Sequence, residues 1–327
     1  MRVVMLEFLR ERADANGELA YADYIRPVLY APELGYYRRP AARIGQDATT
    51  DFYTATSLGP LFGQLIAEAA VNLLGQHDSP SLDPADVAFV EVGAEAGRTV
   101  LDEAGHPFRE VQGVGVDAEM VASGPRVLFS NELFDAQPFE RLVLTERGWA
   151  ERRVRVEEDG LQEVRRPLER NLGVALPDPQ DLPLGYQLDL PLAAVDLLRQ
   201  LVAGEWPGVF IAIDYGLPWD ILATERPHGT ARTYRHHEAG TNLLAHPGET
   251  DVTCHVCWDW LVEALQSNGF RRVDVMRQEA FFMHLAPKSI QRAISDPAAL
   301  STDRQALKAL LHPHHFGSKF QVLVGLR

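Results

Sequence analysis

The sequence predicts an α/β protein built on a doubly wound, Rossmann-like sheet. From residue 87 onward, short runs rich in valine, leucine and phenylalanine alternate with segments of helical periodicity. This alternation is typical of a mainly parallel sheet with helices on both faces. Before it, residues 1–76 are mostly helical in spacing, and a β-hairpin with a helix interrupts the alternation at about 146–205. We therefore expect an N-terminal helical lid region over 1–76 and the Rossmann-like domain over 77–327.

The N-terminal region has two stretches with helical spacing. The first includes Leu6, Leu9, Ile25 and Val28 and stops at a turn over 32–35, which contains proline and glycine. The second is a helix expected over 59–74, because its apolar residues recur on one face. A linker rich in aspartate, serine and proline, residues 77–86, then separates the helices from the first strand.

Seven strand-like runs follow the linker. They lie at 87–92, 111–116, 127–130, 141–145, 209–214, 272–276 and 320–326. Within the insertion, residues 148–164 alternate valine with charged side chains, and Asp159-Gly160 provides the turn of a solvent-facing hairpin. Residues 188–202 have helical periodicity.

Composition limits the classes of partner. The chain has 327 residues, 46% hydrophobic and 24% charged, enough for one large core or two modest ones. A net charge of -15 without a concentrated basic stretch argues against a nucleic-acid partner. Cys254 and Cys257 are the two cysteines, which suits a reducing compartment. With no apolar run of membrane-spanning length and no signal-peptide pattern, we expect a cytoplasmic protein.

The segment 130–138, SNELFDAQP, directly follows the strand-like run 127–130. It places Asn131, Glu132 and Asp135 where that strand ends. In open α/β sheets, ligands bind outside the carboxyl ends of the strands. These side chains therefore indicate a site, although Asp135 can equally be the N-cap of a helix.

A second group of candidate residues follows the first strand. Glu91, Gly93, Ala94 and Gly97 leave that strand and should open a helix, an arrangement that suits a nucleotide-like cofactor. Asp117 ends the second strand at about the spacing of a carboxylate that binds ribose hydroxyls. The alternative is that the glycines only form a turn and that Asp117 caps a helix.

Several segments together resemble a known family. They occur in the family's order and are YAPELGYY (30–37), DFYT (51–54), LFGQL (61–65), EVGA (91–94), NELFDA (131–136), IDYG (213–216), GTAR (229–232) and DVTCHV (251–256). On these segments the chain resembles the class I S-adenosylmethionine-dependent methyltransferases of bacteria and mitochondria. The mitochondrial member of that family is a protein arginine methyltransferase that assists complex I assembly.

The resemblance implies a seven-stranded methyltransferase sheet and S-adenosylmethionine as cofactor. It further implies that a loop containing Asp51, Tyr53 and Thr54 folds over the cofactor. Glu91, Gly93, Ala94 and Gly97 would line its methionine end, Asp117 would bind the ribose, and Asn131 would lie at the mouth. Glu132 and Asp135 would be the catalytic pair, binding a guanidinium whose forked donors suit carboxylates. A protein substrate or assembly partner is the implied partner.

The sequence departs from the family pattern around the same site. Glu95 stands where a second glycine is expected, and 117–126 is too short for the usual helix and third strand. Residues 55–59 lack the family's Pro-Glu pair, and Cys257 replaces an acid after His255. Three alternatives follow: an active protein methyltransferase, a binding or assembly factor with weakened or lost catalysis, and a methyltransferase for a small molecule.

Three other clusters have simpler explanations. Cys254, His255 and Cys257 leave a four-ligand metal site incomplete, so we expect no metal. The aromatic residues Tyr36, Tyr37, Phe52 and Tyr53 can stack on a ligand but more often anchor a lid. The basic stretch 232–237 is by default a solvated loop, and the alternative is that Arg232 contacts the cofactor's carboxylate.

If Glu95 fills the first loop, the Glu95→Gly substitution should raise the affinity for S-adenosylhomocysteine, because it removes bulk and negative charge where backbone approaches the ligand. Calorimetric titration of wild type and variant measures this. An unchanged dissociation constant would show that Glu95 does not block the site.

Overall fold

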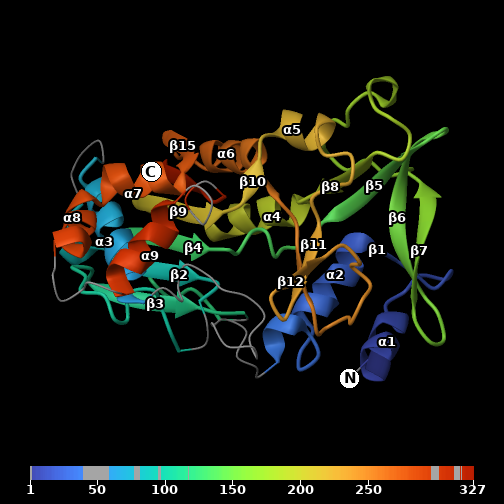
Figure 1. Ribbon diagram of the computed structural model, residues 1–327, viewed down its shortest axis with the longest axis horizontal. Helices are drawn as coiled ribbons and strands as arrows, with labels where there is room; N and C mark the ends of the chain where they lie inside the picture. Colours follow the sequence, from blue (N-terminus) through green and yellow to red (C-terminus); the bar gives the residue numbers. More distant parts are fainter. Residues whose placement is uncertain are drawn as a thin grey trace.

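The structure is a computed structural model. It describes residues 2–39, 59–76, 82–94, 97–116, 118–295, 302–312, 317 and 319–327. A sheet flanked by helices occupies one half, and a second, smaller sheet with the N-terminal helices occupies the other (Figure 1).

The central sheet confirms the predicted α/β class. Among the described residues it has six strands in the order β15-β16-β9-β4-β2-β3. Their bounds are β2 (Ala88–Val92), β3 (Glu110–Val114), β4 (Arg126–Asn131), β9 (Gly208–Asp214), β15 (Arg272–Arg277) and β16 (Gln321–Leu326). The strands β3, β2, β4 and β9 are parallel, and β16 runs antiparallel to both its neighbours. All four parallel carboxyl ends therefore meet at one edge.

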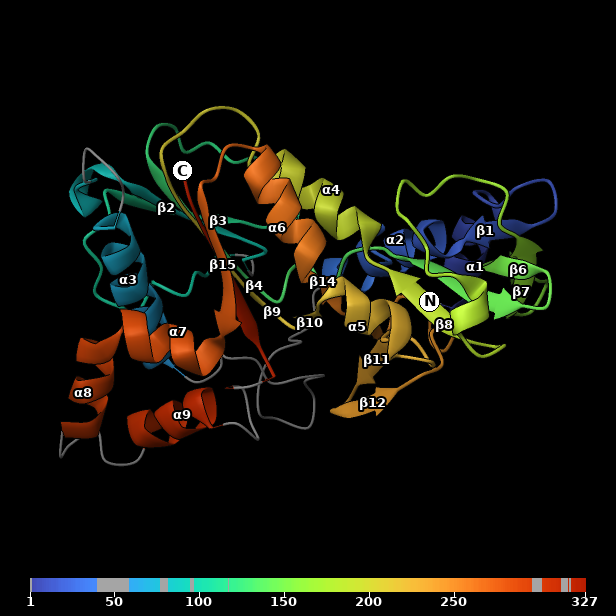
Figure 2. The ribbon, with the colours of Figure 1, turned by 90° about the horizontal axis from the view of Figure 1, so that it is seen from above.

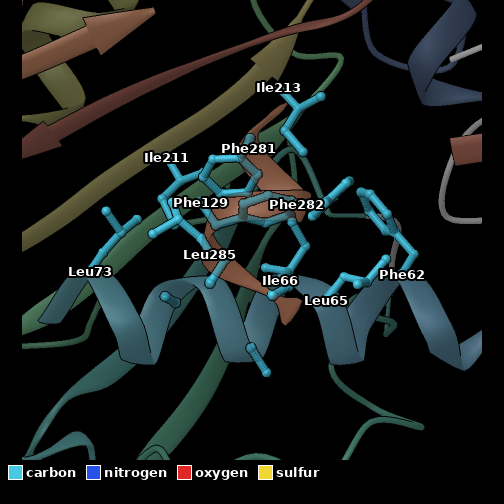
Figure 3. Packing of buried hydrophobic residues seen from close by; sticks show 14 of the residues in the cluster. Phe62, Leu65, Ile66, Leu73, Phe129, Ile211, Ile213, Phe281, Phe282 and Leu285 are labelled. Carbon is cyan, nitrogen blue, oxygen red and sulfur yellow. The ribbon is translucent and has the colours of Figure 1, made fainter. Parts of the chain in front are cut away.

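Side-chain alternation builds a core on each face of this sheet. Phe129 and Ile211 point to one face, and Leu128 and Phe210 point to the other. The first face is covered by α3 (Pro60–Leu74), α7 (Gln278–Leu285), α8 (Pro287–Ser295) and α9 (Thr302–Leu311), and the second by α4 (Leu192–Leu201) and α6 (Trp258–Ser267) (Figure 2). Figure 3 shows α3 and α7 packing their apolar side chains against Phe129 and Ile211.

The second sheet contains the predicted hairpin. Its strands are β1 (Glu18–Ala20), β5 (Glu140–Thr145), β6 (Gly148–Val156), β7 (Leu161–Pro167) and β8 (Gln187–Leu190). The order is β1-β6-β5-β8, with β7 also on β6, and the amide of Glu157 donates to the carbonyl of Gly160 at the hairpin turn, 2.9 Å. The run 141–145, predicted among the central strands, instead pairs antiparallel with β6 and β8.

The N-terminal helices pack against this second sheet. Helices α1 (Arg2–Arg10) and α2 (Tyr21–Tyr30) form a core with β1 and β6, whereas α3 belongs to the core of the central sheet. The remaining elements are short. They are η1 (Tyr36–Arg38), η3 (Pro84–Asp86), η4 (Pro179–Asp181), β10 (Gly216–Leu217), α5 (Trp219–Thr224), β11 (Arg232–Arg235), β12 (Glu238–Gly240), β13 (Asp251–Thr253) and β14 (Val256–Cys257).

The helix expected to open at Gly93–Gly97 is absent from the described residues between β2 and β3. Asp102 accepts hydrogen bonds from the amide and the hydroxyl of Thr99, at 3.1 and 2.5 Å, and such local bonds compete with a helix. The resulting turn packs tightly on α3, since a Cβ on Gly63 would lie 1.9 Å from the carbonyl oxygen of Val100. The prediction of a helix here was wrong.

The segment between β3 and β4 is short, as the sequence indicated, and its described residues contain no strand. One side chain on the edge strand β3 holds this segment. The amide group of Gln112 donates to the carbonyl of Glu119, 3.0 Å, and accepts from the amides of Val121 and Ala122, 3.2 and 3.0 Å. The segment 118–122 is therefore tied to the sheet edge by a side chain instead of a backbone ladder.

Two further features are absent from the described part of the chain. None of its helices is long and apolar enough to cross a membrane. Nor does it contain a group of three or more histidine, cysteine, aspartate or glutamate side chains that could hold a metal ion.

We expect Gln112→Met to lower the free energy of unfolding by about 1–1.5 kcal/mol, because it removes three hydrogen bonds to the backbone, one of which is partly buried. Urea denaturation measures the change. The matched control is Gln162→Met on the exposed part of β7, expected to stay within about 0.5 kcal/mol of wild type. Equal stability of the two variants would contradict this role of Gln112.

Candidate active site

A cleft of about 710 Å³ lies at the carboxyl ends of the parallel strands. Val92 and Gly93 at the end of β2, Val114 and Gly115 at the end of β3, and Leu133 after β4 line it from the central sheet. Residues of α1, α2 and α4 also line it. The cleft is therefore at the position where open α/β sheets bind ligands.

Gly93 lets the backbone form the floor of this cleft. Its φ is +83°, and a Cβ there would come within 3.1 Å of the Leu133 side chain. A substituent at this position is both strained and crowded. The backbone can thus approach a ligand closely, as a nucleotide-like cofactor requires.

The other predicted cofactor residues have different positions. Among those that the structure describes, Gly93 lines the cleft directly. The carboxylate of Glu91 accepts a hydrogen bond from the amide of Val100, 2.6 Å, in the loop that follows β2. Burial raises the pKa of Glu91 to about 7. Glu91 therefore shapes the loop that carries Gly93. Four predicted residues and one predicted blocking residue lie outside the described part of the chain: Asp51, Tyr53, Thr54, Asp117 and Glu95.

The predicted catalytic pair lies in a turn after β4. Glu132 has a φ of +52°, the left-handed region that a non-glycine residue rarely adopts. Asp135 is buried, and no helix begins directly after it, since β5 follows at Glu140, so the N-cap interpretation was wrong. The turn instead depends on Asp214 at the end of β9, whose carboxylate accepts from the amides of Phe134, Asp135 and Tyr215 at 2.9, 3.3 and 2.9 Å.

Carboxyl groups at this turn favour their protonated forms. Burial, reinforced by Asp135, raises the pKa of Glu132 to about 8. Burial also raises the pKa of Asp135 to about 6, although the Tyr215 hydroxyl donates to it, and raises that of Asp214 well above its usual range. A group of carboxyl groups with raised pKa values beside a cleft, which Leu133 and Gln137 of the same turn line, is typical of functional sites.

Three buried oxygens at the end of β4 have no hydrogen-bond partner among the described residues. They are the Ser130 hydroxyl oxygen, the Asn131 side-chain oxygen and one carboxylate oxygen of Asp135. The orientation of Asn131 follows from its own amide nitrogen, which donates to Glu132 at 3.1 Å. Buried polar atoms are nearly always paired. This group of acceptors therefore suits a ligand that brings hydrogen-bond donors.

Tyrosines cover the turn from the N-terminal side. The Tyr30 hydroxyl donates to the carbonyl of Ala136, 3.0 Å, and its ring stacks on Tyr37 with centroids 5.5 Å apart. The Tyr37 hydroxyl donates to Asp251 at 2.9 Å. Tyr30, Asp214 and Asp251 cover or support this turn, and none of them was predicted from the sequence as a site residue. Each lies inside a family-like segment, but only three-dimensional contact shows its role.

The cysteine motif and the basic stretch contribute less. Burial raises the pKa of both cysteine thiols, and it lowers that of His255, whose ring packs on Tyr215, to about 4. These groups are neutral at pH 7. The basic stretch is not a solvated loop but the hairpin of β11 and β12, in which Arg232 donates to the carbonyl of Ala231 at 2.6 Å.

Comparison with known proteins identifies the family. The family model described as "Putative S-adenosyl-L-methionine-dependent methyltransferase" matches residues 110–276, slightly more than half of the chain. The chain belongs to this methyltransferase family. S-adenosylmethionine is the cofactor on which the family depends. A comparison with curated proteins gives no match.

Solved structures agree with this assignment. A Burkholderia thailandensis protein bound to S-adenosylhomocysteine, described as a "likely methyl transferase", is 25% identical with a TM-score of 0.84, covering 99% of this chain and 92% of its own. A native structure of an uncharacterized protein from the same organism is 24% identical with a TM-score of 0.80 and the same coverages. Both alignments cover nearly all of this chain, so the two structures share its fold.

The pH dependence of stability tests the environment of Glu132. A carboxyl group with a raised pKa in the folded state lowers stability as pH rises from the unfolded pKa, about 4.5, through the folded value of about 8. We expect Glu132→Gln, which does not titrate, to gain at least about 2 kcal/mol over wild type between pH 5 and pH 8, at about 1.4 kcal/mol per pKa unit. Urea unfolding across this range measures the difference. A pH-independent difference would show that Glu132 titrates normally.

Proposed function

We propose that this methyltransferase transfers a methyl group to a protein side chain, the guanidinium of arginine. The observation that carries the proposal is the acceptor-rich turn beside the glycine-floored cleft. Asn131, Glu132 and Asp135 offer oxygen atoms there, and two of those oxygens have no described partner. A guanidinium has five N–H donors and no acceptor, so its chemistry is complementary to this set.

The cofactor, when bound, supplies an electrophilic methyl group on a sulfonium. The cleft provides the wall for it, because Gly93 and Gly115 leave room for close approach. We extend the proposal to Ala94, Gly97 and Asn131 near this wall, to Glu91 through its loop, and to Asp51, Tyr53, Thr54 and Asp117, which resemble the family's cofactor residues.

The carboxylates orient the acceptor nitrogen and hold its proton. In the transfer, the nitrogen–methyl bond forms as the sulfur–methyl bond breaks, and the guanidinium gives up one N–H proton. Glu132, with a pKa near 8, can accept that proton and pass it to solvent. Asp135 is held by Tyr215 and by the backbone bonds to Asp214, so it positions the forked donors.

One observation favours a second candidate, a methyltransferase fold that binds a partner with weakened catalysis. In most Rossmann-like sites a helix begins directly after the glycine loop, and its N-terminus helps hold the ligand. The described residues 97–109 form turns there instead. Retained binding without transfer would be the behaviour of such a protein.

Transfer of a labelled methyl group tests the proposal. We expect wild type with [methyl-³H]S-adenosylmethionine to label a randomised arginine-containing peptide library and not its lysine-matched counterpart. Transfer should rise with pH through about 8, as Glu132 ionises. Glu132→Gln should lower it by about 100-fold, in the range that general-base catalysis contributes, while leaving S-adenosylhomocysteine binding in calorimetry unchanged.

The other outcomes separate the candidates. Labelling of the lysine library alone would overturn the arginine assignment. Binding of S-adenosylhomocysteine without transfer to either library would favour the non-catalytic candidate. The matched control is Glu119→Gln, an exposed carboxylate near β3, which should transfer at the wild-type rate.

A further inference from the structure

The cleft has a basic side that the proposed chemistry does not use. Three arginines line it: Arg12 from the end of α1, Arg26 from α2, and Arg38 from η1. Gly93 and Gly115 of the central sheet line the same cleft. A ligand bound there therefore enters a cleft that also presents guanidinium groups.

Two of these arginines already have partners. Arg12 donates to the carbonyl of Phe8 at 2.9 Å and stacks over the Phe8 ring, with 3.4 Å between the guanidinium carbon and the ring centroid. Arg38 donates to the carbonyl of Tyr30 at 3.3 Å. Both side chains are thereby directed by their local contacts.

Arg26 is different. It makes no hydrogen bond or ion pair with any residue of the described chain, and it does not pair with Asp23 one turn earlier, which lines the same cleft. Arg26 lies one helical turn from Tyr30 on the face of α2 that looks onto the cleft, a rise of about 6 Å. Tyr30 contacts the turn that carries Glu132 and Asp135 through Ala136. Arg26 therefore lies about one turn of α2 farther from Glu132 and Asp135 than Tyr30 does.

We propose that Arg26 binds the α-carboxylate of the cofactor's amino-acid end. The inference rests on the proposed cofactor site. The sulfonium has to lie near the catalytic turn, and four bonds separate it from the carboxylate carbon, about 5 Å when extended. That length is close to the rise between Tyr30 and Arg26.

A guanidinium pairs with a carboxylate through two parallel hydrogen bonds, so an arginine suits this position. Arg232, the sequence-based alternative, does not line the cleft.

A pair of ligands isolates this contact. S-adenosylhomocysteine carries the amino-acid end, whereas 5′-methylthioadenosine shares the adenosine and thioether but lacks it. We expect Arg26→Gln to weaken S-adenosylhomocysteine binding by about 10- to 100-fold, the effect of losing a charged hydrogen bond, and to change 5′-methylthioadenosine binding by less than about twofold. Calorimetry gives both constants.

Two further variants complete the test. Arg199→Gln removes an exposed arginine of α4 that does not line the cleft, and it should leave both constants unchanged. Arg26→Lys should recover part of the lost affinity for S-adenosylhomocysteine, because charge is kept and the fork is lost.

Each contrary result has a separate meaning. Equal weakening of both ligands by Arg26→Gln, or no weakening of either, would overturn the role of Arg26 and leave the cofactor site standing. If wild type binds neither ligand at millimolar concentration, the proposed cofactor site fails and the inference fails with it.

Discussion

The candidate site depends on one buried carboxylate that joins two neighbouring strands. Asp214 ends β9 and accepts three backbone amides, two of them from the turn after β4. Burial and the nearby Asp135 raise the pKa of Asp214 well above its usual range, and the backbone hydrogen bonds from Tyr215 and Phe134 offset only part of this effect. These bonds add to the one that the amide of Glu132 donates to the carbonyl of Ile213, 2.9 Å, in holding the left-handed backbone at Glu132. The position of the whole acceptor-rich turn therefore follows from the end of a different strand.

Groups of opposite charge lie in the cleft and beside it. Arginines gather on the side formed by the N-terminal helices, and carboxylates gather at the ends of β4 and β9. The two groups come from parts of the chain that are far apart in sequence and that belong to different cores. Association of the second sheet and α2 with the central sheet thus creates the polarity of the site, and neither half has it alone.

Sequence patterns predicted the parts of the fold that rest on periodicity. The alternation of Phe129 with Leu128, the apolar face of α3 and the hairpin at Asp159-Gly160 were all readable, because burial and turn chemistry leave a local signature. The pairing of strands could not be predicted from these patterns. The run 141–145 has the same apolar character as a central strand, and only its pairing with β6 and β8 assigns it to the second sheet. Glu132 and Asp135 were predicted from their position after a strand, whereas Asp214 acts through hydrogen bonds to a turn that is distant in the sequence.

The tie between Gln112 and residues 118–122 has a consequence for local motion. Most of a sheet is protected from hydrogen exchange because its amides are bonded along a continuous ladder. Here the amides of Val121 and Ala122 share a single side-chain oxygen, so the rotation of one glutamine releases both at once. Opening of this segment needs no other strand to separate. Residues 118–122 should therefore exchange their amide hydrogens well before the rest of the central sheet. The edge of the cleft at Val116 and Ala118 can open locally while the hydrophobic cores on both faces of the sheet stay packed.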